Sequence, residues 1–150
     1  MQFPFSLAAA ALALSSTGLA FPYLVPRTNI TNTCWTRDPV CLGYQADAVN
    51  ASITIVNACA KVPTCTPGEK NHGRKKVTGI VKSFPYTATL YIGDNCAGVE
   101  QWSQEACQAL FQWRIDDICE QAYPKGESLY QLGYNSAVCD TSSVSFNFGG

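Results

Sequence analysis

The sequence of 150 residues contains one histidine, His72, and no two cysteines separated by only two residues. A serine or cysteine nucleophile needs a nearby base, usually histidine, and a structural zinc site needs closely spaced cysteines or histidines. The G-x-S-x-G, H-E-x-x-H, P-loop and Rossmann fingerprints are also missing. We therefore expect a protein that binds a target without catalysing a reaction and without a metal or other cofactor.

A glycosidase uses a pair of carboxylates. The chain has eleven acidic residues, so composition does not exclude this class of enzyme, but no pattern singles out two of them. Asp116 and Asp117 are adjacent, and neighbouring helix positions point about 100° apart. Together with Glu120 they lie mainly off the apolar stripe of the helix predicted there. We expect all three to be solvated surface groups.

Long apolar runs are scarce. The run Leu7–Leu14 is too short to cross a bilayer, and residues 1–20 carry no charged side chain and end in small residues. This pattern predicts a signal peptide over 1–20, cleaved after Ala20, and a secreted, extracellular protein. A loose arm over 21–33 and one domain over 34–150 follow, with no later run of about 18 apolar residues that would insert stably into a membrane.

All eight cysteines lie in the predicted mature chain, which indicates four disulfides in an oxidising compartment. They are Cys34, Cys41, Cys59, Cys65, Cys96, Cys107, Cys119 and Cys139. Eight cysteines allow about a hundred pairings, so spacing alone leaves the connectivity open. The sequons at Asn29 and Asn50 are predicted glycosylation sites in such a compartment.

Periodicity predicts two helices among several strands. Residues 45–60 form the first, with Val49, Ile53 and Val56 toward the core and Asn50 on the solvent side. The second begins after the N-cap Ser103 and runs to about residue 122. Its apolar stripe is Cys107, Phe111, Ile115, Ile118 and Ala122. Strands are predicted over 77–81, 86–92, 129–132 and 143–148, and the absence of βαβ alternation gives an α+β fold with the helices on one face of the sheet.

Charges make up only 14% of the chain and the formal net charge is −1, yet half of the ten basic residues lie in one segment. These five are Lys70, Arg74, Lys75, Lys76 and Lys82. Such a loop can contact nucleic acid, an anionic membrane surface or the acidic ring of a cation channel, or it can be solvated without a role. A slightly acidic, secreted chain without an aromatic platform in this loop argues against nucleic acid.

Several segments in order resemble one family. They are NTCWTRDPVC, ITIVNAC, PTCTPGEKNHGRKKVTG, LYIGDNCAGVEQWSQEACQALFQWRIDDIC and SLYQLGYNSAVCDTSSVSFNF, and they extend from Cys34 to Phe148. The order and spacing of the cysteines and the Arg-Lys-Lys-Val run of the loop resemble the fungal killer toxins of the KP-four type. The prototype of that family is encoded by a double-stranded RNA virus of smut fungi, and it has chromosomal relatives in filamentous fungi.

The resemblance implies an α/β sandwich, an antiparallel sheet with two antiparallel helices on one face. It also implies a monomer that interferes with voltage-gated calcium channels of a competing fungus or host cell. The family's active lysine falls on Lys76, with Lys70, Arg74 and Lys75 as supporting charges. This chain has Thr78 where the family has a cysteine, and the gain of Cys139 implies that Cys41 pairs with Cys139.

The alternative function is that of a secreted glycan-binding, lectin-like effector. Exposed aromatic rings stack on sugars, although aromatic residues more often pack in a core. The candidates are Trp35, Trp102, Trp113, Tyr123, Tyr130 and Tyr134.

Overall fold

The computed structural model of the chain describes residues 34–35, 37–70 and 76–149. The predicted signal peptide, the arm over 21–33, the sequon at Asn29 and the basic residues Arg74 and Lys75 lie outside these residues.

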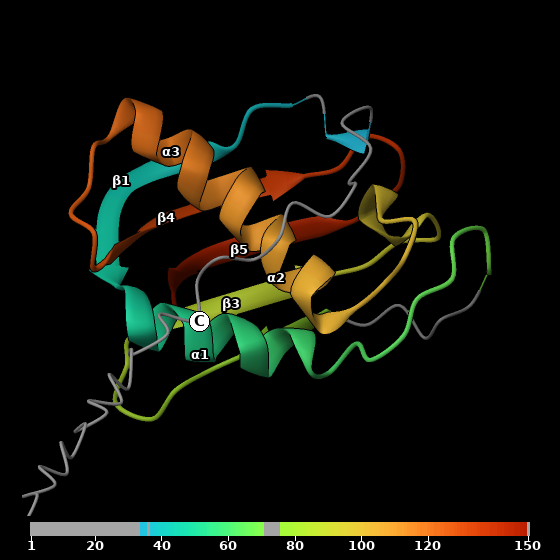
Figure 1. The fold of residues 1–150 in the computed structure, drawn as a ribbon, viewed down its shortest axis with the longest axis horizontal. Coiled ribbons are helices and arrows are strands. Elements are labelled where there is room, and N and C mark those ends of the chain that lie inside the picture. Colours follow the sequence, from blue (N-terminus) through green and yellow to red (C-terminus); the bar gives the residue numbers. More distant parts are fainter. Residues whose placement is uncertain (1–33, 36, 71–75, 150) are drawn as a thin grey trace, which may run out of the picture.

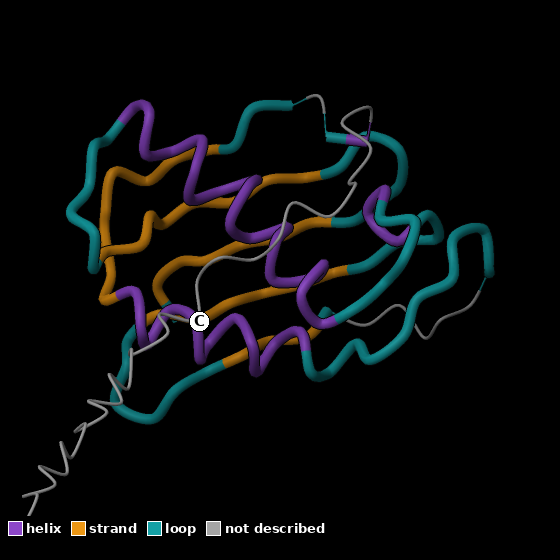
Figure 2. Tube along the Cα trace, viewed as in Figure 1, coloured by secondary structure: helices purple, strands orange, loops and turns teal. Residues whose placement is uncertain are grey.

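Five antiparallel strands form one sheet in the order β1-β4-β5-β3-β2 (Figure 2). The strands are β1 (Val40–Asp47), β2 (Val77–Gly79), β3 (Tyr86–Tyr91), β4 (Leu129–Ser136) and β5 (Ser143–Phe148). The four predicted strands are present, although β2 ends earlier than predicted, at Gly79, and β4 extends further, to Ser136, while β1 was missed. Its alternation is interrupted by a bulge around Gly43, which has a φ of +71°.

Two helices cover one face of this sheet and run antiparallel to each other (Figure 1). The first is α1 (Ala48–Cys59); the second joins α2 (Gln104–Phe111), a π-helical turn over Gln112–Asp116 and α3 (Asp117–Ala122). This two-layer arrangement confirms the predicted α+β fold with an antiparallel sheet.

Side-chain caps begin both helices. The Ser103 hydroxyl accepts a hydrogen bond from the backbone N–H of Ala106 at 3.0 Å, so the predicted N-cap is confirmed. Helix α1 begins later than predicted because Gln45 belongs to β1, and Asp47 caps it by accepting from the Asn50 backbone N–H at 2.9 Å. Asn50 is half-buried, and its side-chain amide also donates to Asp47 at 3.0 Å.

The buried face of α1 is the opposite of the predicted one. Val49, Ile53 and Val56 are 60%, 45% and 38% exposed. The buried residues are Ala51, Thr54, Ile55, Ala58 and Cys59. Small side chains on this face bring the helix so close to the sheet that a Cβ on Gly79 would lie 1.9 Å from the Thr54 carbonyl oxygen. The close approach of the helix and strand backbones therefore decides which face of α1 is buried, although the opposite face carries the larger apolar side chains.

The π-helical turn changes the face of the second helix. It inserts one extra residue into a turn, so Cys119 is buried where the regular period placed Ile118, and Ala122 is exposed. The same shift carries Asp116 into the core, where it is 1% exposed. The expectation that Asp116 is solvated is therefore wrong, whereas Asp117 and Glu120 are exposed as expected.

The eight cysteines form four disulfides, as predicted. The pairs are Cys34–Cys139, Cys41–Cys119, Cys59–Cys107 and Cys65–Cys96. The expected pair Cys41–Cys139 is wrong because β1 runs beneath α3 and places Cys41 next to Cys119, while Cys139 meets the start of the domain at Cys34. Within the described residues, each helix is too short or too polar to cross a bilayer.

Candidate functional site

Lys76 lies immediately before the edge strand β2 and is exposed. In the described part of the chain it makes no hydrogen bond or ion pair with another residue. The acids Asp116 and Glu120 pair instead with Lys125, so they do not neutralise Lys76. Lys76 thus presents an ammonium group that is available to a partner.

Strand β2 is held from both sides, which fixes the direction of Lys76. On one side Thr78 pairs with Thr89 of β3. On the other side lie α1 and the turn after it. Asn57 of α1 donates its amide to the Ile80 carbonyl at 3.0 Å, and the Lys61 ammonium of the turn donates to the Thr78 carbonyl. Side chains of α1 and of the turn after it therefore satisfy backbone groups that an edge strand otherwise exposes.

The start of the basic loop is tied to a turn over residues 93–98. Cys65 is bonded to Cys96, and the Gly68 backbone N–H donates to the Asp94 carbonyl at 2.8 Å. Cys96 and Ala97 have φ angles of 51° and 57°, in the left-handed region that non-glycine residues rarely adopt. Lys70 follows this anchored segment and is exposed.

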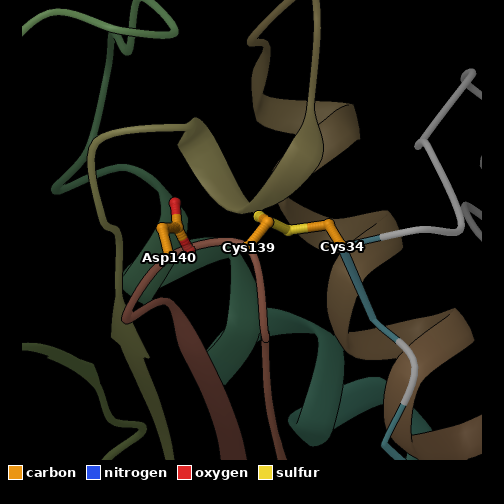
Figure 3. Close-up of side chains that lie close together, drawn as sticks. All are labelled: Cys34, Cys139 and Asp140. Carbon is orange, nitrogen blue, oxygen red and sulfur yellow. A yellow bond between two sulfur atoms is a disulfide. The ribbon is translucent and has the colours of Figure 1, made fainter.

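Asp140 supports that turn. Its carboxylate accepts from the backbone N–H groups of Asn95 at 3.0 Å, Ala97 at 3.2 Å and Ser142 at 2.8 Å. Cys34, Cys139 and Asp140 offer ligand atoms within 4.8 Å of one another, a spacing that a metal could use (Figure 3). The two sulfurs are oxidised to a disulfide and the carboxylate is engaged by amides, so the cluster is a structural tie.

Beside Lys76, the face of the sheet opposite the helices forms a hollow of about 540 Å³. Its walls come from β2, β3, β5 and β4, and every lining residue other than Lys76 is uncharged. Most carry hydroxyl or amide groups, namely Thr78, Thr87, Thr89, Tyr134, Asn135, Ser136, Ser143, Ser145 and Asn147.

A second hollow of about 770 Å³ lies between α1 and the start of β4. Val49, Ile53 and Leu129 give it apolar walls, and the buried pair Asp116–Lys125 lies at its side. Asp116 also accepts from the backbone N–H of Gln131 at 2.7 Å and from the Gln112 amide at 2.8 Å. These bonds satisfy the buried carboxylate. Tyr130, a candidate for sugar stacking, lines this hollow but is 2% exposed, and Lys70 and Lys76 do not line it.

Although Asp117 is exposed, partial removal of its carboxylate from water raises its pKa, and the neighbouring charge of Asp116 adds to that rise. A hydrogen bond from the Gln112 amide at 2.7 Å opposes it. Glu105 lies at the start of α2. Its carboxylate accepts hydrogen bonds from the backbone N–H of Glu105 itself and from the Ser103 side chain, and these bonds lower its pKa.

Most of the aromatic candidates for sugar stacking belong to the core. Trp35 and Tyr130 are 5% and 2% exposed, and Trp102 and Trp113 pack against the core. Tyr123 and Tyr134 are each 44% exposed, and only Tyr134 lines the hollow beside Lys76.

The hollow itself was not predicted from the sequence. The alternating Thr87 and Thr89, and Ser143 and Ser145, mark polar positions of two strands. Their alignment across four strands depends on register, which no local pattern provides. In a comparison with known proteins, no family model, curated protein or solved structure matches this chain.

Proposed function

We propose that the protein is a secreted, killer-toxin-like inhibitor that binds a cell-surface calcium channel of a competing fungus or host cell and reduces calcium uptake. Lys76 is the central contact, and Lys70, Arg74 and Lys75 add positive charge in the same segment of the sequence. The protein acts by binding, without a catalytic step and without insertion into the membrane.

One observation carries this proposal: Lys76 is an exposed cation immediately before an anchored edge strand, with no acidic partner among the described residues. Cation pores are lined by carboxylates, and an ammonium group presented to them competes with the permeant ion. A fixed β2 reduces the conformational freedom lost on binding. The four disulfides are compatible with action outside the cell.

Growth assays on sensitive fungi and on plant tissue, with and without added calcium, test this function. We expect the purified protein to inhibit growth, calcium to relieve the inhibition, and Lys76→Gln to weaken it. Lys82→Gln is the matched control because Lys82 is an exposed cation of the same segment that does not line the hollow. Inhibition that calcium does not relieve and that Lys76→Gln leaves unchanged contradicts the proposal and favours the alternative, a glycan-binding effector.

A further inference from the structure

We propose that the hollow beside Lys76 is a binding site for an acidic glycan, a chain of sugars that carries carboxylates. The site shares Lys76 with the proposed function but does not depend on a calcium channel, so the two can be tested apart. Its volume of about 540 Å³ is within the range of ligand sites in proteins.

Strand register places four polar side chains in one row across the uncovered face. Thr78 pairs with Thr89, Thr89 pairs with Ser145, and Ser145 pairs with Tyr134. Paired residues point to the same face, and adjacent strands lie about 4.8 Å apart. The row is therefore about 14 Å long, long enough to contact an oligosaccharide rather than a single sugar.

The chemistry of the row matches a ligand that is itself covered with hydroxyl groups. Hydroxyl and amide groups both donate and accept hydrogen bonds, as sugar hydroxyls do. The Ser145 hydroxyl accepts from the Asn147 amide at 2.9 Å, which leaves its own proton to donate outward. Within the described residues, the hydroxyls of Thr78 and Thr89 make no hydrogen bond, so a ligand can supply their partners.

The two ends of the row differ, and this difference selects an acidic glycan. At the β4 end Tyr134 is 44% exposed and offers a ring face for a sugar to stack on. At the β2 end Lys76 precedes Thr78 by two residues and so lies on the same face. No lining residue is acidic, so a carboxylate on the glycan meets one unopposed cation there.

Isothermal titration with oligogalacturonate, and with the same oligosaccharide as its neutral methyl ester, tests the site. We expect the acidic form to bind about tenfold more tightly than the ester, because a charge-assisted hydrogen bond to Lys76 is lost in the ester. Lys76→Gln should remove this preference and Lys82→Gln should keep it. Tyr134→Ala and the nearly isosteric Thr89→Val should weaken the binding of both ligands several-fold. Circular dichroism should show that each variant is folded.

The inference is overturned if neither ligand binds the wild-type protein, if Thr89→Val and Tyr134→Ala leave binding unchanged, or if Lys82→Gln lowers it as much as Lys76→Gln. Sedimentation showing a dimer whose interface needs Tyr134 also overturns it, since a second copy then occupies the face. Calcium-relieved growth inhibition without oligogalacturonate binding refutes only this site, whereas binding without any effect on growth refutes only the proposed function.

Discussion

Gly79 of β2 lies in direct contact with the backbone of Ala58 in α1: a Cβ added to Gly79 would lie 2.4 Å from the Ala58 nitrogen. No side chain can move aside to relieve this contact, because the opposing atoms belong to the helix backbone. We expect Gly79→Ala to destabilise the fold by about 3 kcal/mol, measured by urea unfolding. Gly126→Ala is the control, since the nearest atom to its Cβ is a flexible leucine methyl at 3.8 Å. Equal stability of the two variants would contradict the close packing of α1 on β2.

The inverted face of α1 gives a second prediction. Ile55 is 4% exposed and Ile53 is 45% exposed, although both are isoleucines of the same helix. Ile55→Ala should cost about 2–4 kcal/mol through lost burial and a cavity, while Ile53→Ala should cost less than about 1 kcal/mol. Thermal and urea unfolding measure both. A larger loss for Ile53→Ala would mean that the stripe Val49, Ile53 and Val56 is the buried one after all.

Adjacent acids should behave in opposite ways. Asp116→Asn leaves Lys125 without its buried partner and should destabilise the protein by about 3 kcal/mol at neutral pH, as measured by urea unfolding. Lys125 retains Glu120 only at 3.8 Å, so that carboxylate cannot replace Asp116. A loss below about 0.5 kcal/mol would exclude the buried ion pair.

Asp117→Asn is the matched control and has its own pH dependence. The pKa of Asp117 is raised in the folded protein, so its contribution to stability falls as pH rises through that pKa. Asp117→Asn should therefore raise the stability slightly at neutral pH, by less than about 1 kcal/mol because solvent screens the group. Below the unfolded pKa the variant and the wild type should converge. Greater stability of the wild type at neutral pH would contradict the sign.

Loss of the hydrogen bonds between Asp140 and the turn over 93–98 should make that turn more mobile. Asp140→Ala removes the acceptor of three backbone N–H groups and should cost about 2–3 kcal/mol. Hydrogen exchange should speed up most at the amides of Asn95 and Ala97. Glu100→Gln, at an exposed carboxylate, is the control. Unchanged exchange at Asn95 and Ala97 would show that the disulfide Cys65–Cys96 holds the turn without Asp140.

The sequence predicts the elements of this fold better than their orientation. Strong alternation marks β3 and β5, and Ser103 marks the start of α2, because these signals are local. The buried face of α1 and the position of Asp116 depend on contacts with distant segments, namely Gly79 beneath the helix and an extra residue in a π-helical turn. The helical period alone therefore predicts neither the buried face of α1 nor the burial of Asp116.

The candidate site also combines a feature that the sequence shows locally with features that depend on distant segments. Lys76 is visible in the sequence as part of a basic cluster, whereas Thr89, Ser145 and Tyr134, which line the same hollow, come together only through sheet register. The disulfide pairing is likewise a tertiary property, which is why Cys139 was assigned to the wrong partner.

The most direct test of the central claim is calcium uptake by sensitive cells in the presence of the wild-type protein, Lys76→Gln and Lys82→Gln. We predict that the wild type and Lys82→Gln reduce the initial uptake of radioactive calcium at similar concentrations, and that Lys76→Gln needs at least about ten times more protein. Equal potency of Lys76→Gln and the wild type, or no effect of the wild type on uptake, would contradict the account.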